Sequence, residues 1–485
     1  MKQELLRYSC VIHGKDRWPE DSIDLQVENP ATGEQIAVVP EVSERSVAEA
    51  VESCALAFCS WKNTSPEDRG QIMKKISRAM IYNTDLLADT ICREVGKPIR
   101  AAQSEVRSSA DLMSYFAEEA PKIKGELPAS GKSDEIVMVT KEPVGVVAAI
   151  TPFNYPLSTL ICKLGPALAA GCTVVAKPDE NTPVSSIILA KLALEAGLPP
   201  GVFNVVTGTG ETTGTYLVEN PLVRLVTFTG SIETGKIILE KSASYVRKVI
   251  LELGGNCPAI ICNGSPWKEN IPAIVKQCFK NTGQYCYRIN RIYVEKEIYT
   301  DFLKSFIEET KKLRIGLPEN PSTDLGPLNN FKIMKRVESH IKDAIRKGAK
   351  LESGGKAISD SPLDSGLYFP PTILTDVNQG MLVMREESFG PVVGVMAVDS
   401  GEVALEYANE GNSGLAAYLF VPDTGTGLKM AQNLESGSVW INTVHQAYFS
   451  VPFGGFKESG LGREKSHYGI EEYLELKATY VSLEV

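Results

Sequence analysis

The sequence predicts an α/β protein with two large domains, each built on a mainly parallel β-sheet. Short β-branched segments alternate with helix-like segments over residues 142–253, and the alternation resumes after Gly255. Such alternation is typical of βα units, whose right-handed crossovers place helices on both faces of a parallel sheet. At ~150 residues per domain, the 485 residues allow two large domains or three smaller ones. Apolar residues make up 43% of the chain, enough for a sizeable core.

Charge and cysteine usage exclude several classes of protein. With 50 Lys and Arg against 60 Asp and Glu, the net charge is −10, which argues against binding to nucleic acid or to an anionic membrane. A bound nucleotide stays open, because helix N-termini can hold phosphate. The ten cysteines form no C-x-x-C pair, so neither a disulfide framework nor a metal site is expected. The start, MKQELLRYSC, lacks the apolar run of a secretory signal, and we expect a cytoplasmic protein with free thiols.

The elements are expected in the following order. Turn-rich residues 28–40 lead into a short strand, and residues 43–120 show helical periodicity, beginning at Ser43, with packing as their expected role. The uncharged stretch 143–162 could span a bilayer by its length, but its three prolines favour strand, turn and helix. The strands of the five βα units are expected at 144–150, 173–176, 202–206, 225–228 and 249–253, with helices beginning near Pro156, Pro183, Thr212 and Ser231.

The second α/β region follows the same pattern. Its strands are expected near 259–261, 292–294, 392–396 and 416–420, with helices near 298–313 and 331–347. Residues 363–372 are expected to form a loop, and the Gly-rich residues 451–462 a surface turn.

Polar groups cluster where the five predicted strands end: TPFN (151–154), KPDE (177–180), TGTG (207–210), TGS (229–231) and ELGG (252–255). Ligands of such sheets bind outside the carboxyl ends of the strands, so a phosphate-bearing ligand beside a polar catalytic centre is predicted. Gly208, Gly210 and Gly214 are spaced one residue off the dinucleotide fingerprint, and glycines in such turns are also common for backbone reasons. Glu252 lies among apolar residues, where a carboxylate is paired, has a raised pKa or faces a cleft; the last two suit a general base.

Cys286 is the candidate nucleophile among the cysteines. It follows a helical stretch, 271–280, and a Gly-containing turn in FKNTGQYC (279–286), which leaves backbone N–H groups free around the thiol. A thiol with the usual pKa of ~8.5 needs such donors or a nearby base to react. The alternative, a buried core cysteine, fits Cys172, Cys257 and Cys262 better, because they lie in or beside apolar strands.

Eight motifs in a fixed order carry a resemblance to the aldehyde dehydrogenase superfamily, from ENPATGE (28–34) to residue 483. They are TPFNYP (151–156), GPALAAGCTVVAKP (165–178), GVFNVVTG (201–208), FTGS (228–231), LELGG (251–255), FKNTGQYC (279–286), EESFGP (386–391) and PFGGFKESGLGRE (452–464). Residues 165–208 and 459–477 are most similar to the succinate-semialdehyde dehydrogenase branch.

The resemblance implies a reaction and its residues. Cys286 would add to an aldehyde as a thiohemiacetal, Asn154 and the Cys286 N–H would stabilise the oxyanion, and Glu252 would activate the water that hydrolyses the thioester. Glu252 favours hydrolysis over transfer to coenzyme A; an acylating enzyme and a non-catalytic paralogue are the alternatives. The residues implied to bind NAD are Pro152, Phe153, Lys177, Pro178, Glu180, Gly210, Gly230, Ser231, Leu253, Glu387 and Phe389. Glu180 would repel a 2′-phosphate, so NAD is favoured, with NADP open.

Substrate choice is left open by the resemblance. The implied substrate residues are Tyr155, Cys162, Lys280 and Tyr448. The last three align with two arginines and a serine that hold a distal carboxylate in the succinate-semialdehyde branch, and Lys does not reproduce the bidentate Arg fork. Succinate semialdehyde is therefore one candidate, beside small aldehydes such as lactaldehyde or glyceraldehyde.

The resemblance also implies a domain organisation. A Rossmann-like NAD-binding domain would comprise residues 1–120 and 144–254, and a second α/β domain, the catalytic one, residues 255–455. A small β element at 121–143 and 472–485 would build a homodimer or homotetramer.

Overall fold

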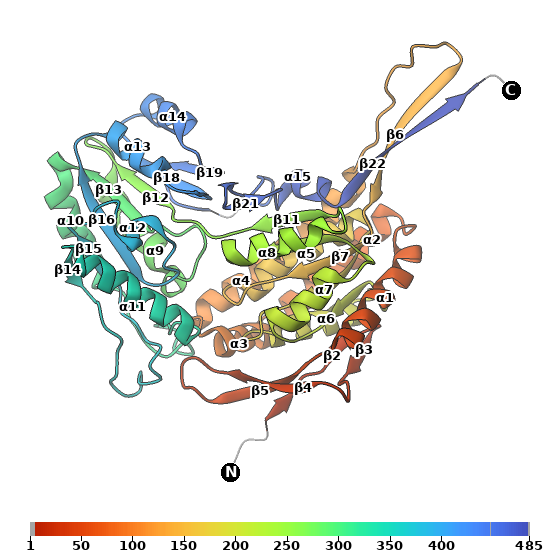
Figure 1. Cartoon of the computed structure of the whole chain (residues 1–485), viewed down its shortest axis with the longest axis horizontal. Coiled ribbons are helices and arrows are strands. Elements are labelled where there is room, and N and C mark those ends of the chain that lie inside the picture. The colour runs from red at the N-terminus through yellow and green to blue at the C-terminus, as the bar shows by residue number, and fades with distance from the viewer. Residues whose placement is uncertain (1–4, 447, 484–485) are drawn as a thin grey trace.

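The structure is a computed structural model that describes residues 5–446 and 448–483, with two α/β lobes and a projecting arm (Figure 1). The first lobe contains an eight-stranded sheet of order β21-β11-β10-β7-β8-β9-β2-β3. Its five central strands are parallel and confirm the predicted βα units: β7 (Val146–Ile150), β8 (Thr173–Lys177), β9 (Phe203–Val205), β10 (Val223–Thr229) and β11 (Lys248–Glu252). The α/β fold predicted from the sequence is therefore confirmed.

The strand order reverses at β7, which lies between β8 and β10. The chain runs outward from β7 through β8 and β9, then returns to add β10 and β11 on the other side of β7. The carboxyl ends of β7 and β10 therefore diverge into the crevice where open α/β sheets bind ligands. Thr151 and Thr229 stand at these two ends.

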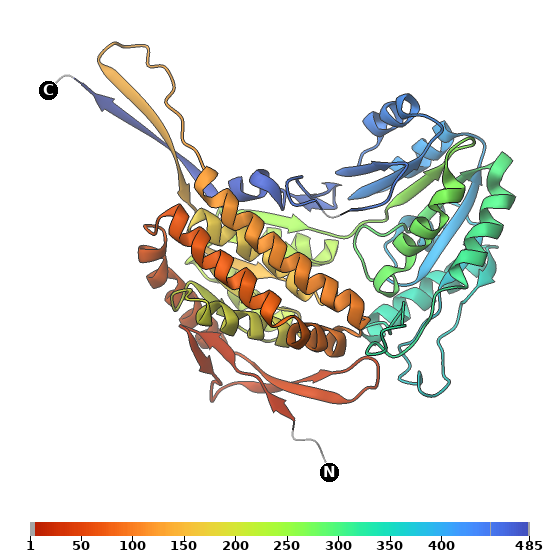
Figure 2. The same ribbon diagram turned by 180° about the vertical axis from the view of Figure 1, so that it is seen from behind.

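Helices cover both faces of this sheet. One face carries α5 (Pro156–Ala170) and α6 (Val184–Glu195), which are covered in turn by α2 (Pro66–Tyr82), α3 (Thr84–Val95) and α4 (Ile99–Glu119). Figure 2 shows these long helices in red and orange. The other face carries α1 (Glu44–Trp61), α7 (Thr215–Glu219) and α8 (Ile232–Ala243). Ser43 caps α1 as predicted, accepting from the Ser46 N–H, whereas a π-helical turn at Gly210–Gly214 moves the start of α7 to Thr215.

The second lobe contains a seven-stranded sheet of order β14-β15-β16-β13-β12-β18-β19. The four predicted strands are β12 (Pro258–Ile261), β13 (Arg291–Glu295), β16 (Val392–Val398) and β18 (Ala416–Phe420), all parallel. The sheet also has β14 (Lys350–Ser353), β15 (Thr372–Thr375) and β19 (Ser438–Ile441). The helices are α9 (Trp267–Phe279), α10 (Lys296–Thr310), α11 (Phe331–Arg346), α12 (Leu382–Arg385), α13 (Gly401–Asn409) and α14 (Thr424–Asn433).

The turn predicted over residues 451–462 is confined to Glu458 and Ser459, and the short strands on either side of it were not predicted. This segment forms β20 (Phe456–Lys457), which pairs with β17 (Ser413–Gly414), and β21 (Gly460–Leu461), which joins the first sheet antiparallel to β11. Its glycines serve close approach: a Cβ at Gly460 would lie 2.7 Å from the Leu251 carbonyl oxygen. The segment thus borders Glu252 at the end of β11.

The arm consists of β6 (Glu135–Pro143) and β22 (Leu474–Ser482), which pair antiparallel along their whole length and project from the body (Figure 1). Leu476 and Tyr480 on this arm are exposed. The N-terminal strands complete the fold: β1 (Leu6–Arg7), β4 (Ile23–Glu28) and β5 (Gln35–Glu41) form a separate sheet, and β2 (Cys10–Ile12) and β3 (Lys15–Arg17) extend the first sheet. In the described part of the chain, no helix is both long and apolar enough to cross a membrane.

Candidate active site

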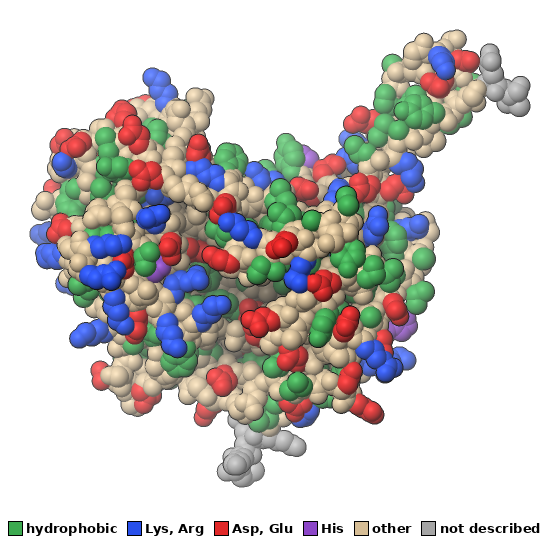
Figure 3. Space-filling view, viewed as in Figure 1, with side chains coloured by type: hydrophobic (Ala, Val, Ile, Leu, Met, Phe, Trp, Pro, Cys, Tyr) green, Lys and Arg blue, Asp and Glu red, His purple; other side chains and the backbone are tan. Residues whose placement is uncertain are grey.

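A cavity of about 1140 Å³ opens between the two lobes, and Figure 3 shows the surface hollowed there. It extends from the carboxyl ends of β7, β8 and β10 to the turn that carries Cys286. The predicted residues that line it are Pro152, Phe153, Asn154, Tyr155, Cys162, Lys177, Glu180, Gly210, Gly230, Ser231, Glu252, Leu253, Lys280, Cys286, Glu387 and Phe389. Segments far apart in the sequence therefore converge on one cavity.

Two predicted residues lie away from the cavity wall. Pro178 is buried behind the end of β8, and the side chain of Tyr448 is 56% exposed, with its hydroxyl donating to Gln446 Oε1 at 3.0 Å. Of the described residues near Tyr448, it is His445 and Phe449 that face the cavity.

The turn before Cys286 is held in an unusual conformation. Asn281 and Thr282 both have positive φ, of 52° and 56°, which is rare for any residue and strained for a β-branched one. Several side-chain hydrogen bonds hold it. Among them, Thr282 Oγ1 donates to the Gly326 carbonyl at 2.8 Å, Asn281 Nδ2 to that of Gln284 at 3.2 Å, and Gln284 Nε2 to that of Asn281 at 3.1 Å. The strain is thus maintained to present the next residues, including Cys286, to the cavity.

The Cys286 thiol is held in its protonated form at rest. Burial raises its pKa well above the ordinary value, and the Glu387 carboxylate adds to this effect, while Lys465 opposes it. All ten cysteines are free, and Cys172, Cys257 and Cys262 are buried as expected. Among the described cysteines, Cys59 alone is more exposed than Cys286, and it does not line the cavity.

Glu252, the last residue of β11, is a buried carboxylate without a hydrogen-bond partner among the described residues. Burial raises its pKa well above the ordinary value, and the nearby Glu464 raises it further. Its Oε1 lies close to Gly454, where a Cβ would come within 2.9 Å. A carboxylate kept buried and unpaired inside a cavity is suited to taking a proton from a ligand or a water.

Two charged residues beside Glu252 were not predicted. The Lys163 ammonium pairs with Glu464 and donates to Thr229 Oγ1 at 2.6 Å. Both side chains are buried, and they oppose each other in their effect on the Glu252 pKa. The one available signal was a lone lysine inside the otherwise uncharged segment PLSTLICKLGPALAA.

Asn154 follows β7 and directs its side-chain amide at the turn that carries Cys286. Its Nδ2 donates to the Gln284 carbonyl at 3.0 Å, two residues before the thiol. A neutral amide donor beside a thiol can stabilise the oxyanion that forms when the thiol adds to a carbonyl.

The β8 and β10 side of the cavity fits a dinucleotide. Lys177 pairs with Glu180 at 3.2 Å, and Ser231 caps the 12-residue helix α8, whose N-terminal N–H groups can bind a pyrophosphate. Toward the thiol, Glu387 accepts from the Gly255 N–H at 3.3 Å, and Phe389 packs edge-on against Phe153. A Cβ at Gly254 would overlap the Glu387 carboxylate, which would then have to shift.

On the other side of the thiol, aromatic rings form an arc with an ammonium at each end. Lys280 Nζ lies 5.1 Å from the Tyr285 ring, and Lys465 Nζ lies 4.9 Å from the Phe453 ring. Tyr285 and His445 share a hydrogen bond of 3.1 Å, and the Tyr287 ring lies 4.3 Å from His445 and 5.1 Å from Phe453. Lys465 was not predicted as a site residue. It lies in the segment GREKS (462–466) and has a positive φ, a conformation that the sequence alone does not show.

Comparisons with known proteins agree with this geometry. A family model described as the aldehyde dehydrogenase family matches residues 18–479. Mitochondrial succinate-semialdehyde dehydrogenase of Arabidopsis thaliana is 40% identical, over 99% of this chain and 90% of its own length. NADP⁺-dependent succinate-semialdehyde dehydrogenase of Escherichia coli is 38% identical, over 99% of this chain and 98% of its own. The crystal structure of betaine aldehyde dehydrogenase from Staphylococcus aureus in complex with NAD⁺ superposes with a TM-score of 0.96 at 33% identity, covering 99% of this chain and 95% of that one.

Proposed function

The chain belongs to the aldehyde dehydrogenase family and oxidises an aldehyde with NAD(P)⁺; from that premise we propose that Cys286, Glu252 and Asn154 carry the reaction. The observation that supports this assignment is that a thiol, an unpaired buried carboxylate and an amide donor line one cavity, beside a site that fits a dinucleotide.

Each residue has one task in this scheme. The Cys286 thiol gives up its proton to solvent and its sulfur adds to the aldehyde carbon, while the Asn154 amide and the Cys286 N–H stabilise the negatively charged oxygen. NAD(P)⁺, when bound, accepts the hydride. Cys286 then carries the acyl group as a thioester, and Glu252 takes a proton from the water that cleaves it, releasing a carboxylic acid and the thiol. Glu252 therefore favours hydrolysis over an acylating enzyme, which would require coenzyme A for turnover.

The substrate that this cavity suits is an aldehyde with a distal carboxylate. Lys280 and Lys465 line the cavity, and neither has a carboxylate partner within the described ranges. Arg100 and Lys276 add exposed positive charge to the cavity wall. A partly buried cation without a counter-ion is costly unless a ligand supplies the charge, which favours succinate semialdehyde over neutral lactaldehyde or glyceraldehyde.

Replacing Lys280 by methionine tests the substrate class. We expect the KM for succinate semialdehyde to rise about 10-fold or more, since a charge-assisted contact is lost, and that for a neutral aldehyde such as propanal to stay within about twofold. Burial and the nearby Lys97 and Lys276 ammoniums lower the pKa of Lys280 to about 8. The ammonium is present below this pH, so the KM of the wild type for the carboxylated aldehyde should rise above it.

The measurement is the initial rate of NAD⁺ reduction with a panel of carboxylated and neutral aldehydes. It compares the wild type with Lys280→Met and with Lys465→Met. Equal kcat/KM for the two kinds of aldehyde in the wild type would contradict a carboxylate site.

Glu180 is proposed to select NAD⁺ over NADP⁺. It is a half-exposed carboxylate at the end of β8, beside Lys177, and would repel the 2′-phosphate of NADP⁺. Glu180→Ser removes the charge and leaves Lys177 free to contact that phosphate. We expect the ratio of kcat/KM for NADP⁺ to that for NAD⁺ to rise about 10-fold or more, measured at saturating aldehyde. An unchanged ratio would show that Glu180 does not face the ribose.

The assembly and the domain roles are part of the same proposal. Residues 1–120 and 144–254 would bind NAD, residues 255–455 would supply the nucleophile, and the arm of residues 121–143 and 472–485 would join subunits of a homodimer or homotetramer in the cytoplasm. The exposed apolar residues of β22 support an arm that is covered in an assembly.

A further inference from the structure

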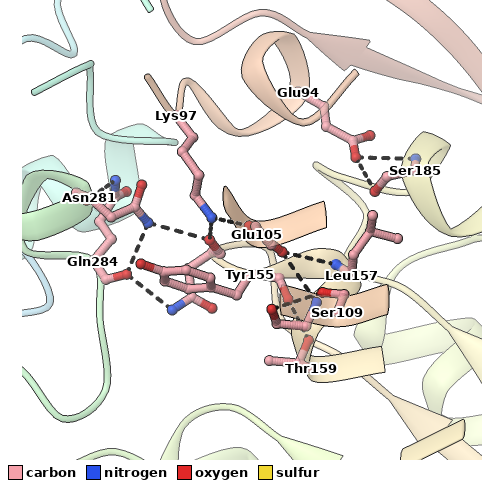
Figure 4. Close-up of polar contacts among 12 residues, drawn as sticks. Glu94, Lys97, Glu105, Ser109, Tyr155, Leu157, Thr159, Ser185, Asn281 and Gln284 are labelled. Carbon is pink, nitrogen blue, oxygen red and sulfur yellow. Dashed lines mark hydrogen bonds and ion pairs between the residues drawn. The ribbon is translucent and has the colours of Figure 1, made fainter. Parts of the chain in front are cut away.

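A completely buried ion pair, Lys97 and Glu105, lies beside Tyr155, the residue that follows Asn154 (Figure 4). Its lysine, Lys97, stands just before α4, and its partner Glu105 lies on α4. Both belong to the helical segment 43–120, whose expected role was packing. Neither side chain is accessible to solvent, so the pair is not a surface salt bridge.

Lys97 contacts two consecutive residues, Asn154 and Tyr155, of the loop between β7 and α5. Its ammonium donates to the Asn154 backbone carbonyl at 2.8 Å and lies 3.5 Å from the centre of the Tyr155 ring. The third group it meets is the Glu105 carboxylate. Asn281 Nδ2 also donates to the Asn154 carbonyl, at the longer distance of 3.3 Å.

Glu105 holds the other end of the same loop. Its Oε1 accepts from the backbone N–H groups of Leu157 at 3.1 Å and Ser158 at 3.3 Å, in the first turn of α5. These N–H groups have no partner within the helix, so a carboxylate there fixes the helix start. The pair therefore hydrogen-bonds to the backbone on both sides of Tyr155, at Asn154 before it and at Leu157 and Ser158 after it.

Stability alone does not explain this pair. Removing two charges from water is costly, and apolar replacements of buried ion pairs are often neutral or stabilising. The contacts made here instead fix the position of Asn154, whose amide donates to the Gln284 carbonyl two residues before the thiol. In an active site a displacement of about 1 Å can lower a rate about 100-fold. We propose that Lys97 and Glu105 are positioning residues that hold the Asn154 amide at the place where the oxyanion forms. The proposal rests on the role of Asn154 given above.

Lys97→Met should lower kcat for aldehyde oxidation about 10-fold to 100-fold, because oxyanion stabilisation acts in the transition state, and should change the KM for NAD⁺ by less than about twofold. If this variant does not fold, Lys97→Met/Glu105→Gln is used; it leaves no unpaired charge, keeps an acceptor for the α5 N–H groups and removes the anchor on Asn154. Its kcat should fall in the same way.

Glu94→Gln is the matched control. Glu94 is also completely buried, also comes from the segment 43–120, and also accepts from the start of a helix, through Val184 N at 2.9 Å and Ser185 N at 3.2 Å of α6. It makes no contact with the Asn154 loop, so its kcat should stay within about threefold of the wild type. An equal loss of kcat in Glu94→Gln and Lys97→Met would overturn the proposal, because it would show that the loss comes from removing any buried charge.

The second measurement adds Lys97→Met to Asn154→Ala. If Lys97 acts through the Asn154 amide, the double variant should lose less than about twofold beyond Asn154→Ala alone, whereas independent effects would multiply. Multiplying effects would overturn the positioning role and leave the proposed function intact. Full activity of Asn154→Ala itself would instead contradict the proposed function.

Discussion

Cys286→Ala is expected to lower aldehyde oxidation about 10⁴-fold or more, because it removes the atom that forms the covalent bond to the substrate. The substitution removes only a sulfur from a residue that lies outside the dinucleotide side of the cavity. Binding of NAD⁺ should therefore stay within about threefold of the wild type, as measured by titration calorimetry. The rate of NADH formation at saturating aldehyde gives the first quantity.

Cys59→Ala is the matched control, since Cys59 is exposed but does not line the cavity, and its activity should be that of the wild type. A mass increase on the remaining thiols after treatment with an alkylating reagent identifies which cysteine was accessible. Loss of modification at Cys286 on adding aldehyde would support the assignment. Appreciable turnover by Cys286→Ala would refute it.

The raised pKa of the thiol bears on how the reaction begins. Burial and the Glu387 carboxylate both raise the pKa of the Cys286 thiol, so the proposed nucleophile is held mainly as the thiol, which is less reactive than the thiolate. The positive charge of a nicotinamide ring placed beside Glu387 would oppose both effects. The rate of alkylation of Cys286 should therefore rise with pH, and at a fixed pH it should rise when NAD⁺ is added.

Much of the fold could be predicted because many strands and helices have a recognisable local sequence pattern. The strands β7 to β11 and β12, β13, β16 and β18 are buried, β-branched runs bounded by turn residues. The strands of the two large sheets that were missed lie at or near the sheet edges. They are β2, β3, β14, β15, β19 and β21, and each has only two to four residues, too few for a pattern that differs from that of a loop. Residues 451–462 were misassigned for a related reason: the sequence does not distinguish glycines that permit close strand pairing from glycines that form turns.

The candidate site divides in the same way. Cys286, Glu252 and Asn154 could be found because each sits at the end of a predicted element within a distinctive motif. Lys97, Glu105, Lys163 and Lys465 could not, because their roles come from contacts between segments that are far apart. Glu105 and Leu157 are 52 residues apart, and Lys163 and Glu464 are 301 apart. A charge on a helix reads as a solvated face until the tertiary structure buries it.

Glu252→Gln is expected to stop the reaction after hydride transfer rather than before it. Glutamine keeps the shape of the side chain but cannot take a proton from water, so the Cys286 thioester should persist. A burst of one NADH per site should be followed by steady turnover that is slower about 10²-fold or more, and intact-protein mass spectrometry should show the acyl adduct. Because the pKa of Glu252 is raised, wild-type hydrolysis should quicken as the pH rises through that value, and the variant should lack this rise.

The discriminating control is Glu387→Gln, at a half-buried carboxylate that also lines the cavity and whose pKa burial raises to about 7. Glu387 lies on the dinucleotide side, against Gly254 and Gly255, and so it should affect the steps before the thioester. Its variant should form NADH slowly without a burst and without an adduct. If Glu252→Gln behaves like Glu387→Gln, another group activates the water. The Lys163–Glu464 pair is then the next to replace, because Glu464 is buried and is the charged residue that affects the Glu252 pKa most.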